Sequence, residues 1–146
     1  MYRYLVIFVI LVLAGCKAAK IPVENENGFI GNATSSTCKV KGKILSILPD
    51  SDDDTTTMCG IHPCFAKVEI LELSDCGAAA TLPYKSGDVV TMRFIHTLQP
   101  TKNIFPTMKP RFPGLRRGDM FQSMAENKKD PDRNNTFIIT SYLRLF

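Results

Sequence analysis

The sequence has no tryptophan, no helical repeat sustained over three turns, and no apolar run long enough to cross a bilayer. Its longest apolar run, Leu5 to Leu13, would rise only about 14 Å as a helix, whereas a membrane span needs roughly 20 residues. The missing helical period argues against a helix bundle and predicts low helix content, with residues 74–82 as the best candidate for one short helix.

Neither charge sign dominates. There are 18 lysines and arginines against 14 aspartates and glutamates, a net charge of +4 that falls to +3 without residues 1–15. Nucleic-acid binding domains usually carry a stronger basic balance, so we predict no nucleic-acid partner.

The first 16 residues have the layout of a secretory signal. Arg3 precedes the apolar run, which ends in Leu13-Ala14-Gly15-Cys16. This segment resembles the lipobox signal of bacterial lipoproteins. The resemblance implies that a diacylglyceryl group is attached to Cys16, that residues 1–15 are removed, and that the new amino terminus is acylated. It places the protein in the bacterial cell envelope, held to a membrane by a lipid anchor.

Residues 16–37 are predicted to form a lipidated tether, because they are small and polar and their apolar residues show no regular spacing. A chain of about 20 such residues has an end-to-end distance on the order of 25 Å. Phe29 and Ile30 are its candidates for local docking. The residue after the cysteine is Lys17 and not aspartate, which in Gram-negative lipoproteins favours the outer membrane.

Residues 38–146 consist of short apolar runs bounded by turn residues, a pattern typical of a small all-β domain. Alternating apolar residues, with Gly42 placed to permit a bulge, predict five strands, at residues 38–48, 65–73, 88–98, 120–125 and 137–146. Gly-Asp pairs at residues 87–88 and 118–119 introduce two of them. The pattern resembles a small five-stranded OB-like or netrin-module-like barrel.

The other four cysteines form an even set, which in an oxidising compartment predicts two disulfides. If the first two strands form a hairpin that closes between Pro49 and Phe65, Cys38 lies opposite Cys76. Cys59 and Cys64 then remain to close a small ring in the loop. Of the three possible connectivities, only this one follows from the hairpin, and the outer bridge is expected to stabilise the sheet.

The segment Cys59-Gly60-Ile61-His62-Pro63-Cys64 allows a second interpretation, because two thiols flank an imidazole. Cys59, His62 and Cys64 would suit copper or zinc, or a redox dithiol with a lowered thiol pKa. The spacing is not Cys-x-x-Cys, however, and the compartment already accounts for a structural disulfide. We therefore predict no metal or other cofactor. His96 falls on the apolar face of its strand and is expected to be packed rather than a ligand.

Residues 99–117 form the most unusual stretch, with four prolines and no acid. Prolines stiffen this loop, while its cations offer contacts to an anionic partner. Its cations are Lys102, Lys109, Arg111, Arg116 and Arg117, and we predict that the last four form a partner-binding face. Alternatively the loop covers one barrel end through Ile104, Phe105, Met108 and Phe112.

Two function classes remain. The first is a non-catalytic envelope lipoprotein that binds a protein, glycan or anionic ligand through this basic loop. The second is a small redox or metal-handling protein centred on Cys59, His62 and Cys64. The sequence contains no motif that joins a nucleophile, a base and an orienting group, so we predict that the protein is not an enzyme.

Overall fold

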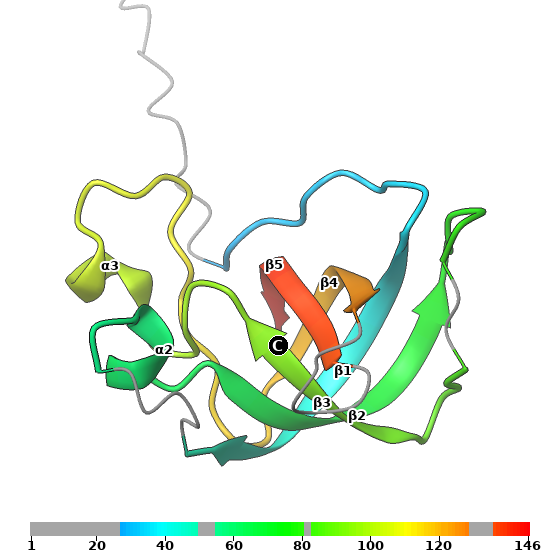
Figure 1. Ribbon diagram of the computed structural model, residues 1–146, viewed down its shortest axis with the longest axis horizontal. Coiled ribbons are helices and arrows are strands. Elements are labelled where there is room, and N and C mark those ends of the chain that lie inside the picture. Colours follow the sequence, from blue (N-terminus) through cyan, green and yellow to red (C-terminus); the bar gives the residue numbers. More distant parts are fainter. Residues whose placement is uncertain (1–26, 50–54, 81–82, 129–135) are drawn as a thin grey trace, which may run out of the picture.

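The computed structural model describes residues 27–49, 55–80, 83–128 and 136–146, which form a closed barrel in the strand order β1-β2-β3-β5-β4 (Figure 1). Its strands are β1 (Thr37–Leu48), β2 (Phe65–Ser74), β3 (Val89–Phe94), β4 (Met120–Lys128) and β5 (Thr136–Leu145). Helix is confined, within the described residues, to the single turns α2 (Met58–Ile61) and α3 (Thr101–Ile104). The predicted small all-β, five-stranded barrel is confirmed.

The strands form because apolar and polar residues alternate along them. In β1, Val40 and Ile44 are fully buried while Lys43 is exposed. Gly42 stands where the pairing of β1 with β2 shifts register, as a bulge requires. A Cβ at Gly42 would lie 2.6 Å from Val68 Cγ1, so glycine leaves room for the packed interior.

Aromatic rings fill the centre of the barrel. The Phe94 ring meets Phe121 and Tyr142 edge to face, with centroid distances of 5.4 and 5.8 Å. Such contacts add to the apolar area that these side chains remove from water. The core therefore joins β3, β4 and β5 across the barrel axis.

Pairing fixes which loops share an end of the barrel. Lys43 in β1 pairs with Met120 at the start of β4, which pairs with Leu145 at the end of β5. The described part of the β1–β2 connection (49 and 55–64) and the β3–β4 connection (95–119) therefore lie at one end, with α2, α3 and the last residues of β5. We call it the helical end. The parallel pairing of β3 with β5, over Met92 to Phe94, closes the barrel.

Several sequence expectations differ from the structure. The fourth strand runs to Lys128 rather than to residue 125. The third strand ends at Phe94 rather than at residue 98, because the chain turns at Thr97, whose φ is 104°. Residues 75–80 do not form the expected short helix. Their backbone instead bonds the start of β1 and the residues before it, with Gly77 N donating to Thr37 O at 2.9 Å and Ala79 N to Ser35 O at 2.8 Å.

The proposed signal and the first part of the proposed tether lie outside the described residues. Residues 27–31 lie against β5, where Gly28 bridges Leu143 and Phe29 stacks on Phe112 at 5.4 Å. The described part of the chain holds no helix that is both long and apolar enough to cross a membrane.

Candidate functional site

The β3–β4 connection closes the helical end with apolar side chains. Phe112 and Leu115 are almost fully buried, and Met108 packs against the same core. Thr101 Oγ1 accepts a hydrogen bond from Phe112 N at 2.8 Å, and Tyr142 Oη accepts one from Gly114 N at 3.0 Å. Part of this loop thus acts as the covering segment that its aromatic residues suggested.

A tight turn ends this connection and presents two arginines. Gly118 has a φ of 92°, which glycine adopts without strain, and its N–H donates to Ile44 O at 2.7 Å. Asp119 Oδ2 accepts a hydrogen bond from Arg116 N at 3.0 Å, which caps the turn. Arg116 and Arg117 are both exposed, because the turn places them outside the barrel.

Beside this turn are two hollows that share Arg116 and Arg144. Together we call them the arginine groove. The first, of about 510 Å³, is lined by Arg116, Gly118, Asp119, Met120, Arg144, Leu145 and Phe146. The second, of about 290 Å³, is lined by Ile47, Pro63, Leu98, Gln99, Pro100, Pro113, Gly114, Leu115, Arg116 and Arg144.

The groove also contains one carboxylate, that of Asp119. Arg144 Nη1 lies 4.0 Å from Asp119 Oδ2, and the Arg144 guanidinium lies over the Phe146 ring at 5.6 Å. The carboxylate also holds the turn through Arg116 N. Both ion-pair side chains are about one-third exposed, so solvent weakens their attraction. A planar guanidinium that remains accessible can bind carboxylate or phosphate in bidentate fashion.

The structure separates the predicted binding residues into two groups. Arg116 lines the groove and Arg117 follows it in the exposed turn, whereas Lys109 and Arg111 line neither hollow. Arg111 Nη2 donates to Pro106 O at 3.4 Å, within its own loop. Arg144 was missed by sequence reasoning. It is a single cation within the last strand, and only strand pairing brings it to Arg116.

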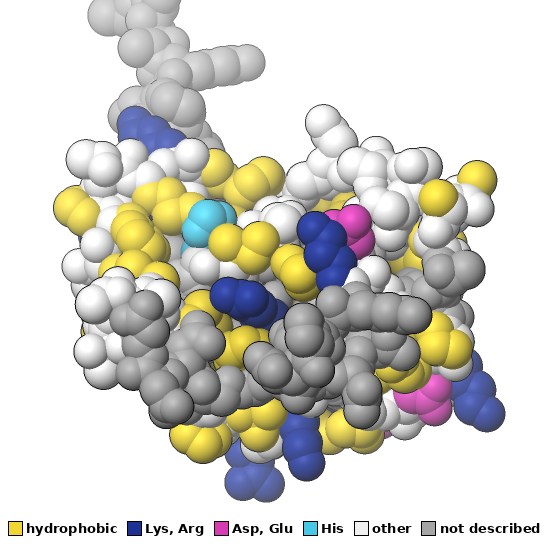
Figure 2. All heavy atoms as spheres, viewed as in Figure 1, with side chains coloured by type: hydrophobic (Ala, Val, Ile, Leu, Met, Phe, Trp, Pro, Cys, Tyr) yellow, Lys and Arg dark blue, Asp and Glu magenta, His cyan; other side chains and the backbone are white. Residues whose placement is uncertain are grey.

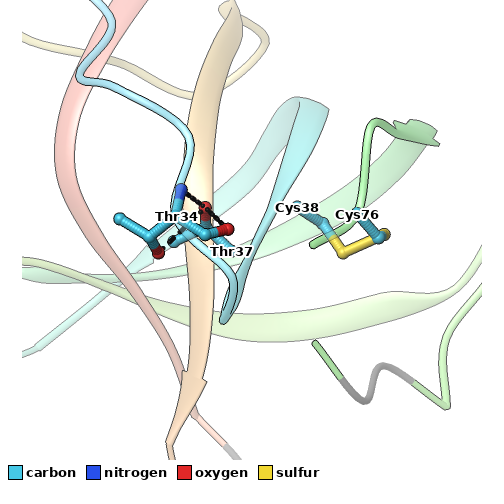
Figure 3. The surroundings of a disulfide bond; sticks show 4 residues. All are labelled: Thr34, Thr37, Cys38 and Cys76. Atoms are coloured by element: carbon cyan, nitrogen blue, oxygen red, sulfur yellow. Dashed lines mark hydrogen bonds between the residues drawn. A yellow bond between two sulfur atoms is a disulfide. The ribbon is translucent and has the colours of Figure 1, made fainter. Parts of the chain in front are cut away.

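The cysteines pair as predicted, Cys38 with Cys76 (Figure 3) and Cys59 with Cys64. The hairpin register differs by one or two residues from the expected one, since Val40 pairs with Leu73 and Ile44 with Val68. The outer bridge still forms because Cys76 lies beyond the end of β2, where the chain turns toward β1. Beside it, Thr37 Oγ1 accepts a hydrogen bond from Thr34 N at 2.8 Å.

The Cys59–Cys64 bond leaves no exposed thiol pair. Cys64 is fully buried and Cys59 is 4% exposed, both packed with Phe65. Metal or redox chemistry there requires accessible thiolates, so bonding and burial disfavour that interpretation. His62 is half-buried at the end of α2. No group of three or more His, Cys, Asp or Glu suited to a metal occurs among the described residues.

His96 is a packed residue, as expected. Its ring is half-buried and stacks on Phe112 at 5.7 Å. Burial lowers the pKa of this imidazole, because the charged form loses hydration.

On the face of the barrel seen in Figure 2, cationic side chains are dispersed among apolar ones.

Comparisons with protein-family models, with curated proteins and with solved structures find no match for this chain. Functional interpretation therefore depends on the geometry of the groove and on the sequence.

Proposed function

We propose that this protein is a lipid-anchored lipoprotein of the bacterial cell envelope, at the outer membrane, whose barrel is a non-catalytic module that binds an anionic partner in the arginine groove. The observation that carries the proposal is that Arg116 and Arg144 line both hollows at the helical end. The partner is an envelope protein, a glycan or another ligand that presents carboxylate or phosphate groups. Guanidinium groups recognise such groups through paired hydrogen bonds.

The lipid anchor is tested by mass spectrometry of the protein from its native membrane. We expect the mature chain to begin at a diacylglyceryl-modified Cys16, with residues 1–15 absent, because the lipobox ends at that cysteine. Cys16→Ser should abolish both the lipid and the cleavage. An unmodified Cys16, or a mature chain that begins at Met1, contradicts the anchor.

The binding face is tested by reversing charges. A chain with all four loop cations, Lys109, Arg111, Arg116 and Arg117, changed to glutamate should fold and lose retention on immobilised polyphosphate. Each exposed cation contributes about 1 kcal/mol or less, so a combined change is needed. Added salt should weaken the parent similarly, since exposed charges are screened within about 8 Å at physiological ionic strength.

Two variants that each carry half of these four substitutions, here called half-variants, locate the site. Arg116→Glu with Arg117→Glu changes the groove, whereas Lys109→Glu with Arg111→Glu makes the same charge change away from it. We expect the first pair to lose most of the retention, measured as the salt concentration of elution. If the fourfold variant is retained as well as the parent at low salt, the loop only covers the core. Equal loss in both half-variants assigns retention to net charge rather than to the groove.

A further inference from the structure

The chain enters the barrel at the rim of the arginine groove. Asn27 O accepts a hydrogen bond from Arg144 N at 2.8 Å, so the first described residue is bonded to the backbone of a groove arginine. Four residues later, Gly31 N donates to Ser141 Oγ at 2.8 Å. The segment 27–31 thus lies along the later half of β5, where Figure 1 shows it in blue above the strand.

This entry point is held by packing as well as by hydrogen bonds. Gly28 is buried with a φ of 92°, and a Cβ there would overlap the carbonyl oxygen of Tyr142. The next residue, Phe29, stacks on Phe112, whose ring stacks on Tyr142 at 4.8 Å. Close backbone approach and a three-ring stack both fix the position of the chain at residues 27–29.

The chain between this point and Cys16 is short. Residues 16–26 can span at most about 40 Å, the length of eleven fully extended residues. This step rests on the proposed function, because it takes Cys16 as the lipid-bearing residue. A lipid at Cys16 then keeps the groove within about 40 Å of the bilayer surface.

The surface around the groove combines cations with exposed apolar side chains. Met120 is 37% exposed and Phe146 is 88% exposed, and both line the first hollow with Arg116 and Arg144. Lys43, which pairs with Met120 across β1 and β4, is exposed as well. Basic residues mixed with exposed aromatic and aliphatic ones are typical of protein surfaces that lie on anionic membranes.

We infer that the arginine groove binds the phosphate groups of anionic lipid headgroups in the bilayer that carries the anchor, so that the helical end of the barrel lies on the membrane. Arg116 and Arg144 contact the phosphates, and Arg117 and Lys43 add attraction around them. Asp119 stays bonded to Arg116 N and keeps the turn in place.

The test is vesicle cosedimentation of residues 16–146 with Cys16→Ser, a chain that contains every described residue. Vesicles of phosphatidylcholine alone are compared with vesicles that contain 30% phosphatidylglycerol. We expect binding to the anionic vesicles only, and Arg116→Gln with Arg144→Gln should weaken it by about tenfold or more, since each basic residue near an anionic surface contributes about 1 kcal/mol. The matched control is Lys67→Gln with Lys85→Gln, which removes two exposed cations elsewhere and should change binding less than threefold.

Three results overturn the headgroup site. They are failure of the parent to bind anionic vesicles, equal binding to both vesicle types, and equal weakening by the arginine and lysine pairs. Because the tested chain carries no lipid, these results are independent of the anchor. If Cys16 carries lipid but vesicle binding does not depend on the arginines, the lipid anchor is supported and the headgroup site is refuted. Arginine-dependent binding with an unmodified Cys16 supports the headgroup site and refutes the anchor.

Discussion

Phe121→Ala should lower the free energy of unfolding by about 3–5 kcal/mol, the usual cost of removing a buried phenylalanine ring. Phe121 is fully buried, and its ring meets those of Phe94 and Tyr142 with centroid distances of 5.4 and 6.5 Å. Its neighbours come from different strands of a closed barrel, so they cannot easily move in to fill the cavity. Urea unfolding measures the effect as a lower midpoint with an unchanged slope.

Phe146→Ala is the matched control, because it removes the same atoms from a side chain that is 88% exposed. We expect a change of less than about 0.5 kcal/mol, as for most surface substitutions. If the two variants are equally stable, Phe121 does not lie in the core.

The second large effect concerns the outer disulfide. Cys38→Ala with Cys76→Ala should cost about 4 kcal/mol, and Cys59→Ala with Cys64→Ala about 2 kcal/mol, in the chain-entropy model. The difference arises because the first bridge joins residues 38 apart and the second residues 5 apart. Unfolding by urea under oxidising conditions, with the parent alongside, compares the two losses.

Reduction provides the control for these variants. In a strong reductant the parent should lose the stability of both bridges, and the two double variants should then differ little from it. If the Cys59–Cys64 variant is the less stable of the two under oxidising conditions, buried packing around Phe65 outweighs the loop-closure effect.

Strand positions could be predicted from the sequence because the pleat alternates side chains between core and solvent. Val40, Ile44 and Lys43 show this in β1. Where a strand ends is set by tertiary contacts instead. Thr97 is fully buried at a positive φ, and its hydroxyl donates to Pro63 O at 3.0 Å. In the sequence, apolar and polar residues keep alternating through this turn as far as Leu98, so the sequence pattern alone overestimated the length of β3.

The cysteine pairing could be predicted because it depends on one hairpin, and an error of one or two residues in register did not change which cysteines meet. The candidate site could be predicted only in part. The lack of acids in residues 99–117 pointed to Arg116 and Arg117, but no local signal separated them from Lys109 and Arg111. Arg144 joins Arg116 through barrel closure, which sequence spacing does not reveal.

Both disulfides lie between residues 38 and 76, whereas the barrel closes only when β5 pairs with β3 and β4. In the export that we propose, a chain that leaves the cytoplasm amino terminus first can form both disulfides before β4 and β5 have followed. Until those strands follow, nothing covers the apolar faces of β1 and β2, and the partly exported chain is exposed to aggregation and proteolysis. We therefore expect export chaperones to matter most at this late stage, after both disulfides have formed.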